Sequence, residues 1–329
     1  MPKGDNSRKS TDAEFTRVFK ALASPVRVAE HFGMDVRSVY NRRNKIEEKY
    51  SIQLPVGEAN SHRGDGGKQP NDYLQRVTVD DFTGTVVVFS DAHYWPNQGP
   101  TLAHRALVEV AKELRPGLLI GNGDLLDGAK LSRFPRNGWE YQPKVRDELE
   151  EVKERLAEIR PGKARRIRTI GNHCIRFDRH LATHAGDMEE VFGTRLKDHL
   201  PAWEECVSVA INGHTMVKHR IFGGIHSGYR NTLNAGWSTV TGHTHLLEAK
   251  PWVDYNGIRW GVSTGAVADV DGPQFSYAED NPKPWCSGFA VLTFDKQGRL
   301  LEPELCRVMY GAAYFRGKAI VSDRARVAA

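Results

Sequence analysis

The sequence has few cysteines and no long apolar run. It contains four cysteines in 329 residues, and no two of them form a Cys-x-x-Cys pair: Cys174, Cys206, Cys286 and Cys306. This spacing predicts neither a zinc knuckle nor a disulfide framework, so we expect reduced thiols in a reducing compartment. No apolar run approaches the roughly 20 residues that are needed to cross a bilayer. These absences exclude a disulfide-stapled secreted domain and a chain embedded in a membrane.

The first residues also lack the features of a targeting signal. The stretch MPKGDNSRKSTD has positive charges but no apolar segment after them, so it does not match a secretory signal. We therefore expect a cytoplasmic protein with no membrane partner. Hydrophobic residues make up 40% of the chain and charged residues 26%, as in ordinary globular proteins. The length fits one large domain and one small one.

Basic charge is concentrated near the amino terminus. Residues 1–50 hold eleven Lys or Arg and seven Asp or Glu, which accounts for +4 of the formal net charge of +5. A small basic segment is typical of a nucleic-acid contact. The pattern also predicts three helices here. Apolar residues recur at helical spacing from Phe15, Ser24-Pro25 marks a second helix at 26–32 that ends at Gly33, and Asp35 can cap a third at 36 to about 49.

The composition then changes at about residue 52. The stretch up to Tyr73 is rich in Gly, Pro, Asn, Ser and charge, which is typical of a linker. We therefore expect a small domain at 1–51, a linker at 52–76 and a large domain at 77–329. The large domain begins with alternating strand and helix patterns. Strands are predicted at 85–89, 118–120 and 166–170, with helices at 101–114 and 144–160 between them.

This alternation predicts an α/β domain with parallel strands in its first half. The second half is richer in strands, and hairpin turns are expected at Asn212-Gly213, Asn256-Gly257 and Lys296-Gln297-Gly298. A sandwich of two sheets with helices outside is the simplest packing.

Polar clusters follow each of the first three predicted strands. They are Ser90-Asp91-Ala92-His93, Gly123-Asp124-Leu125-Leu126-Asp127 and Gly171-Asn172-His173. Ligands bind at the carboxyl ends of strands in an open α/β sheet, so the three clusters can meet at one site. Two further clusters contain His226 and the pair His243 and His245. Mixed nitrogen and oxygen ligands suit Mn, Fe, Zn or Ni better than Ca.

The ordered set D-x-H, G-D-x-x-D, G-N-H, H and G-H-x-H resembles the calcineurin-like metallophosphoesterase superfamily. It runs from Asp91 to His245, about half the chain. The resemblance implies a four-layer sandwich of two mixed sheets flanked by helices. It also implies a centre for two divalent metal ions, with Mn²⁺ expected and Fe, Zn, Ni or Mg as alternatives. The implied ligands are Asp91, His93, Asp124, Asn172, His226, His243 and His245.

The resemblance also implies a division of labour. Asp91, His93 and His245 hold the first metal, and Asn172, His226 and His243 hold the second. Asp124 bridges the two metals, which lower the pKa of a bridging water so that its hydroxide attacks phosphorus. His173 protonates the leaving oxygen and Asp127 orients His173. The sequence departs from the family at Cys174, where Asp or Glu is usual, and we expect that this thiol is not a ligand.

Residues 25–46 resemble a helix-turn-helix. In that motif an Ala, a Gly four residues later and an apolar residue six further on pack the helices, and Ala29, Gly33 and Val39 fit this spacing. Arg42 stands where another apolar residue is usual. The second helix would present to DNA the residues Arg37, Ser38, Asn41, Arg42 and Lys45. A three-helix bundle that serves protein contact or oligomerisation is the alternative.

A DNA-binding module joined to a phosphodiester-cleaving domain indicates a nuclease with DNA as partner. The layout resembles DNA exonucleases and phosphoesterases of this superfamily that tailed phages encode, which would place the protein in the host cytoplasm. One alternative is a phosphatase or nucleotide pyrophosphatase that acts on a small substrate. Another is a non-catalytic DNA-binding regulator on the same scaffold. The sequence leaves open the natural metal, the polarity of cleavage and the oligomeric state.

Overall fold

The computed structural model describes residues 10–52, 54, 75–136 and 138–323. The chain divides into two compact units, Met1–Gln69 and Pro70–Ala329. Most of the predicted linker at 52–76 lies outside the described residues. Within the described part of the chain, no helix combines the length and the apolar character needed to cross a membrane.

The first unit contains three helices: α1 (Asp12–Leu22), α2 (Pro25–Phe32) and α3 (Val36–Tyr50). Their boundaries confirm the expected capping signals. Ser24 caps α2 with Pro25 at its first position, and Gly33 ends it with a φ of +61°, in the left-handed region that glycine tolerates. Asp35 caps α3 by accepting a hydrogen bond from the Ser38 N–H at 2.9 Å. The buried core of the unit is made by Phe15, Phe19, Val28, Ala29, Val39, Ile46 and Leu54.

The second unit contains two mixed sheets, as expected. The larger has eight strands in the order β14 (Lys318–Ser322), β13 (Ala312–Phe315), β12 (Glu304–Met309), β11 (Gly288–Phe294), β2 (Gly84–Phe89), β3 (Leu118–Asn122), β4 (Arg165–Thr169) and β5 (Glu204–Cys206). The smaller has six strands in the order β1 (Arg76–Val79), β6 (Ser208–Ile211), β7 (Thr215–Val217), β8 (Ser238–Thr241), β10 (Gly257–Thr264) and β9 (Leu247–Asp254). Strands β2 to β5 are parallel, which confirms the predicted first half.

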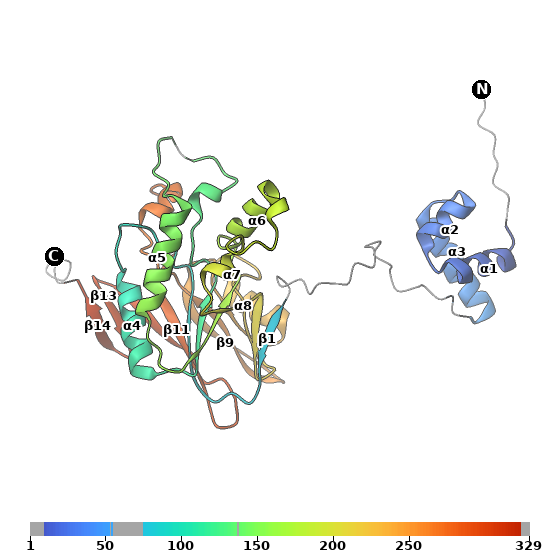
Figure 1. Cartoon of the computed structure of the whole chain (residues 1–329). Coiled ribbons are helices and arrows are strands. Elements are labelled where there is room, and N and C mark those ends of the chain that lie inside the picture. The colour runs from blue at the N-terminus through green and yellow to red at the C-terminus, as the bar shows by residue number, and fades with distance from the viewer. Residues whose placement is uncertain (1–9, 53, 55–74, 137, 324–329) are drawn as a thin grey trace. The chain divides into compact units, whose positions relative to one another are not determined.

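The two sheets pack face to face with helices outside. Alternate residues of β2 explain this, because side chains along a strand point to opposite faces. Val86 and Val88 belong to the core shared with the smaller sheet, while Val87 and Phe89 belong to the core under the helices. Helices α4 (Leu102–Leu114) and α5 (Val145–Glu158) lie on that side of the larger sheet (Figure 1). Helix α8 (Ser227–Ala235) packs on the smaller sheet, at β8, β9 and β10.

The shorter helices gather in the connections. They are η2 (Ala129–Leu131), α6 (Ile175–His184), η3 (Gly186–Met188), α7 (Leu196–His199) and η4 (Pro273–Ala278). The hairpin turns expected at Asn212-Gly213 and Asn256-Gly257 are confirmed between antiparallel strands. The sequence around Ile225-His226-Ser227-Gly228 also predicts the end of a strand, and this prediction is wrong because His226 is the cap residue of α8.

Candidate metal centre

The candidate centre lies where several strands end together. Asp91 and His93 follow β2, Asp124 and Asp127 follow β3, and Asn172 and His173 follow β4. The parallel register of these strands brings their carboxyl ends to one edge. The smaller sheet contributes to the same place, because His219 follows β7 while His243 and His245 follow β8. The structure therefore brings together side chains that are up to 154 residues apart in the sequence, from Asp91 to His245.

Backbone conformation at these positions is unusual. Five of the residues have positive φ angles in the left-handed region: Asp91 (51°), His93 (39°), Asp124 (50°), His243 (67°) and His245 (55°). A residue other than glycine rarely adopts this region, and each instance costs on the order of 1–3 kcal/mol. Strain of this kind persists where the surroundings impose it, and it clusters at functional sites. The turns direct the five side chains into a common space.

Two glycines make room for the carboxylates. A Cβ atom on Gly171 would lie 2.1 Å from Asp124 Oδ1, and one on Gly242 would lie 2.5 Å from Asp91 Oδ2. Neither distance is compatible with a side chain. The glycines of the G-N-H and G-H-x-H motifs are therefore required by the close approach of Asp124 and Asp91.

The first group of candidate ligands is Asp91, His93 and His245, as expected, and their ligand atoms lie within 4.8 Å of one another. Asp91 Oδ1 lies 3.2 Å from His245 Nε2 and 3.9 Å from His93 Nε2. The other oxygen of Asp91 accepts hydrogen bonds from the Ser90 hydroxyl and from the His243 N–H at 2.9 Å. One oxygen is thus held by the protein while the other faces the two imidazoles.

The second group is Asp124, His219 and His243. His219 Nε2 lies 2.9 Å from Asp124 Oδ2 and 3.0 Å from Asn172 Oδ1, so Asn172 joins the group. The Nδ1–H of His219 donates to the carbonyl of Asn122 at 2.8 Å, which leaves Nε2 to face the site. Asp124 follows the same arrangement as Asp91, because its Oδ1 accepts from the His173 N–H at 2.7 Å while Oδ2 faces His219.

His226 does not join this group. It is exposed at the start of α8 and belongs to none of the candidate metal groups in the described part of the chain. His219, which lies in none of the motifs, contacts Asp124 and Asn172 in its place. The assignment of His226 is therefore corrected to His219. His219 comes two residues after β7, just as the other candidate ligands closely follow strands, but β7 is only three residues long and is hard to recognise in the sequence.

Asp127 contacts both His93 and His173. Its Oδ1 lies 2.8 Å from His93 Nδ1 and 3.1 Å from His173 Nδ1. An imidazole that donates one nitrogen to a carboxylate presents the other as a ligand, so Asp127 fixes His93 with Nε2 toward Asp91. Arg176 supports this arrangement by donating to the Asp127 carbonyl at 3.0 Å, and its other amino group lies 3.3 Å from His173 Nε2.

The pKa values of the buried carboxylates and of His219 are strongly shifted by one another. Burial would raise the pKa of Asp91, but His219 and His245 lower it to about 2. Burial opposes ionisation of Asp124 in the same way, and His219 nevertheless holds its pKa well below the usual value. Burial lowers the pKa of His219, whereas Asp124 and Asp91 raise it to about 9. Two buried carboxylates require a compensating cation, a role that either the protonated imidazole of His219 or a divalent metal ion can fill.

Three buried atoms test whether a metal fits. Asp91 Oδ1, His93 Nε2 and Asp124 Oδ2 make no hydrogen bond of good geometry in the described part of the chain, although imidazole nitrogens lie 3.2 and 2.9 Å from the two carboxylate oxygens. Buried polar atoms are normally paired, so each unpaired one needs an explanation. All three residues belong to the groups of candidate ligands, and carboxylate oxygen and imidazole nitrogen are ligands of Zn, Mn and Fe. The residues present therefore fit a metal centre.

Cys174 is buried beside the centre but does not belong to the groups of candidate ligands. Burial, together with the charge of Asp124, raises the pKa of its thiol to about 11. Its backbone N–H lies 3.4 Å from Asp124 Oδ1. The side chain is therefore a protonated thiol packed in the core, as expected for a residue that is not a ligand.

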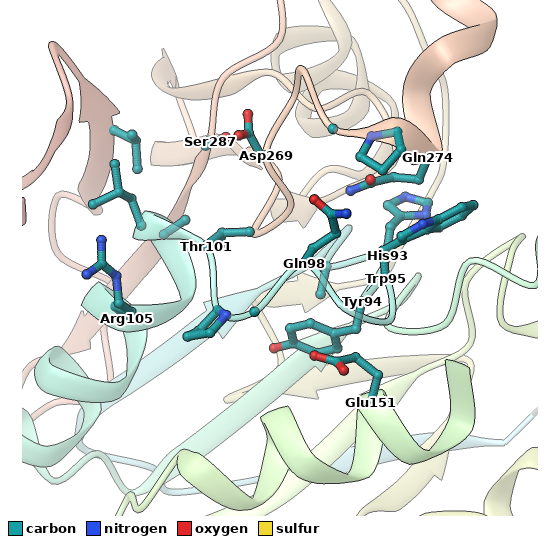
Figure 2. A pocket seen from close by; sticks show the side chains of 18 of the residues that line it. His93, Tyr94, Trp95, Gln98, Thr101, Arg105, Glu151, Asp269, Gln274 and Ser287 are labelled. Carbon is teal, nitrogen blue, oxygen red and sulfur yellow. The ribbon is translucent and has the colours of Figure 1, made fainter. Parts of the chain in front are cut away.

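A cavity of about 490 Å³ adjoins the centre. Figure 2 shows it extending between Arg105 at one end and His93 and Trp95 at the other, with Asp269 and Ser287 on the far wall. Arg105 forms an ion pair with Asp323. The volume is in the range of small-molecule sites, about 300–1,000 Å³.

The five residues expected to contact DNA differ in their surroundings. Arg37, Asn41 and Lys45 are exposed at successive turns of one face of α3. Ser38 is exposed too, but its hydroxyl donates to Asp35 at 2.5 Å. Arg42 differs most, because its guanidinium lies 4.8 Å from the centre of the Phe15 ring and donates to Ser10. It covers the core where the motif usually has an apolar residue.

Comparisons with known proteins give only distant likenesses. No family model matches the sequence, and no curated protein matches it either. Solved structures that align with it include Vps29 complexed with Zn²⁺ from Entamoeba histolytica, at 14% identity over 72% of this chain and 99% of that one, with a TM-score of 0.39. Another is an archaeal phosphodiesterase, at 15% identity over 68% and 99%, with a TM-score of 0.36. Likenesses this distant assign no activity, so the function must be inferred from the site itself.

Proposed function

We propose that this protein is a metal-dependent phosphodiesterase and that DNA is its substrate. The observation that carries the proposal is the clustering of buried ligand-type atoms, among them Asp91 Oδ1, His93 Nε2 and Asp124 Oδ2, which make no hydrogen bond of good geometry in the described chain. The three residues belong to three groups of ligand-type side chains, one of which joins His93 to Asp127 and His173. The ordered motifs from Asp91 to His245 support the same activity.

The residues that would hold the metals are in two sets. Asp91, His93 and His245 form the first, and Asn172, His219 and His243 form the second, with Asp124 between them. Divalent metal ions held there would polarise a phosphoryl oxygen and lower the pKa of a bound water. Mn²⁺ is the proposed natural metal. The mixed set of imidazole, carboxylate and amide ligands also suits Fe, Zn or Ni.

His173 is the proposed general acid. It is partly exposed beside the ligand groups, and Asp127 lies 3.1 Å from its Nδ1. Burial lowers the pKa of His173, but Asp127 and Asp124 outweigh burial and raise it above the ordinary value. A protonated imidazole here can give its proton to the oxygen of the departing alcohol. Arg176 donates to the Asp127 carbonyl at 3.0 Å and so supports Asp127, while its charge beside His173 opposes protonation of that imidazole.

The first unit is proposed as a DNA-binding helix-turn-helix. Support comes from the basic charge of residues 1–50 and from the exposed row of Arg37, Asn41 and Lys45 on α3. These residue types contact phosphates and base edges. Joining DNA binding to phosphodiester cleavage raises the local concentration of substrate at the second unit.

A second candidate is a phosphatase or pyrophosphatase that acts on a small molecule. The cavity beside His93 favours it, because its volume suits a nucleotide-sized ligand. In that case the first unit would serve only to locate the enzyme.

A panel of substrates distinguishes the candidates. The full chain with Mn²⁺ is assayed on bis-p-nitrophenyl phosphate, p-nitrophenyl phosphate, a dinucleotide pyrophosphate, and linear and circular DNA. The proposal expects cleavage of the diester and of DNA in preference to the monoester. Preference for the monoester or the pyrophosphate would overturn the DNA nuclease. No turnover on any substrate, together with no bound metal, would support a non-catalytic DNA-binding regulator.

A further inference from the structure

The loop between η2 and α5 presents an unusual set of exposed aromatic side chains. Phe134, Trp139 and Tyr141 are 64%, 94% and 64% exposed. Large rings that stay in water contribute little to folding, because burial is what makes them stabilising. Three of them within eight residues indicate a surface that is covered by something else. We call Phe134, Trp139 and Tyr141 the aromatic loop.

Hydrogen bonds hold the segment that contains the aromatic loop next to the candidate metal centre. The segment leaves the centre directly after Asp127, and the carboxylate of Glu148 in α5 accepts hydrogen bonds from the Gly128 and Ala129 N–H groups at 2.6 and 3.3 Å. In its middle, Glu140 accepts a hydrogen bond from the Ser276 hydroxyl of η4. Figure 1 shows this loop arching over the end of the sandwich where η4 also lies.

Further rings connect the loop's neighbour η4 to the metal ligands. Phe275 lies 5.2 Å from His93 and 5.1 Å from His245 between ring centres. The next ring, Tyr277, lies 6.4 Å from Phe275 and is 55% exposed. Burial raises the pKa of the Tyr277 hydroxyl, and so do the charges of Asp127, Asp91 and Asp124, which agrees with its place beside the centre. A path of rings thus leads from the ligands out to solvent.

The charge of this segment matches a polyanion. Residues 130–144 contain four basic residues and one acidic residue. The guanidinium of Arg133 lies 5.0 Å from the Phe134 ring centre, and that of Arg136 lies 5.8 Å from the Trp139 ring centre. The Phe134 and Trp139 rings therefore each have a positive charge over one face. Alternating aromatic and basic side chains are how proteins hold unpaired nucleotides, since the bases stack on the rings and the phosphates meet the charges.

We propose that the aromatic loop and Tyr277 bind unpaired nucleotides next to the scissile phosphate of a single-stranded nucleic acid. The inference rests on the proposed phosphodiesterase activity and names its substrate class. Bases inside a duplex are stacked on one another and cannot offer their faces to these rings, so the loop selects single strands or frayed ends. The occupant is recognised through base faces and backbone charge, without a required sequence.

The test compares a hexanucleotide of single-stranded DNA with a hexanucleotide that has the same backbone but abasic sites. The value measured is the ratio of kcat/KM on the two for the full chain, for Trp139→Ala/Tyr141→Ala and for Trp139→Phe/Tyr141→Phe. The alanine pair should reduce the ratio by at least about tenfold, as expected when base stacking on aromatic rings is lost. The phenylalanine pair should keep most of the wild-type ratio. Tyr255→Ala is the matched control, because Tyr255 is fully exposed in the turn between β9 and β10, at the far end of β10 from the centre.

The other possible results overturn either the role of the loop or the proposed function. An unchanged ratio in the alanine pair overturns the inference, and so does an equal loss on both oligonucleotides, which would mean that the loop acts without the bases. Hydrolysis of bis-p-nitrophenyl phosphate by the wild-type chain reports on the proposed function separately, because that substrate has no base. If the wild type cleaves nothing, the proposed function fails, and fluorescence anisotropy of the two labelled hexanucleotides then decides whether the loop binds bases.

Discussion

His219 and His226 differ sharply in their surroundings although both precede α8. His219 is buried between Asp124 and Asn172, while His226 is exposed. His219→Ala should reduce bound Mn²⁺ from about two ions per chain to about one. It should also lower kcat/KM on bis-p-nitrophenyl phosphate by more than roughly 100-fold. Loss of a residue that only hydrogen-bonds to a metal ligand costs up to about that much, and loss of a ligand should cost more. His226→Ala, the matched control, should keep both values. Loss of a metal in His226→Ala with none in His219→Ala would restore the assignment made from the sequence.

His173 should be separable from the ligands. His173→Ala should keep the metal content and lose about 10²–10⁴-fold in rate on an alkyl diester, the usual contribution of a general acid. The loss should be much smaller on p-nitrophenyl esters, whose leaving group departs without a proton. An equal loss on both kinds of ester, measured under the same conditions, would show that His173 acts in some other way.

Most of the candidate ligands could be predicted from the sequence because they sit in short motifs after strands. Asp91, His93, Asp124, Asn172 and His245 lie where those motifs placed them. His219 could not be found in this way because no motif surrounds it and β7 is only three residues long. The positive φ angles at five of the ligands also leave no trace in the sequence, because tertiary contacts impose them.

At the level of elements, strands with continuous β-branched runs were predictable and short polar helices were not. Strand β2 reads Thr-Val-Val-Val-Phe from Thr85 and is buried from Val86 to Phe89, as expected of a strand between two layers. Helix α8 begins with Ser227 and Gly228 and has no long apolar face. Its place is set by packing on β8, β9 and β10, so local propensity gave no indication of it.

The exposed face of α3 carries the prediction about DNA. Arg37→Ala/Lys45→Ala should weaken binding of duplex DNA and lower the slope of log K against log salt by up to about 1.8, since each phosphate contact contributes about 0.9. Arg17→Ala/Lys20→Ala in α1 removes the same charge from exposed positions and serves as the control. Equal weakening by the two pairs, measured by anisotropy across a salt series, would mean that only net charge matters. Arg42 is a poor probe of DNA contact because its packing on Phe15 makes its loss a change in stability.

For the whole molecule, the division into two units predicts separable activities. All of the candidate ligands lie beyond residue 90, so deleting residues 1–60 should leave kcat/KM on bis-p-nitrophenyl phosphate within about twofold, because distant sites act independently. The same deletion should weaken binding of duplex DNA and flatten its salt dependence. Binding of DNA that is unchanged at every salt concentration would show that the first unit has another role.

The most direct test of the metal centre is the metal content of the full chain after loading with Mn²⁺ and gel filtration, measured alongside turnover of bis-p-nitrophenyl phosphate. The wild type should retain about two ions per chain, lose activity when a chelator removes them and regain it with Mn²⁺. Asp124→Ala should bind less metal and turn over no substrate, because this carboxylate faces the ligands of the second group and is the proposed bridge. A wild-type chain that is active without metal, or an Asp124→Ala variant with normal metal content and normal rate, would contradict the two-metal account.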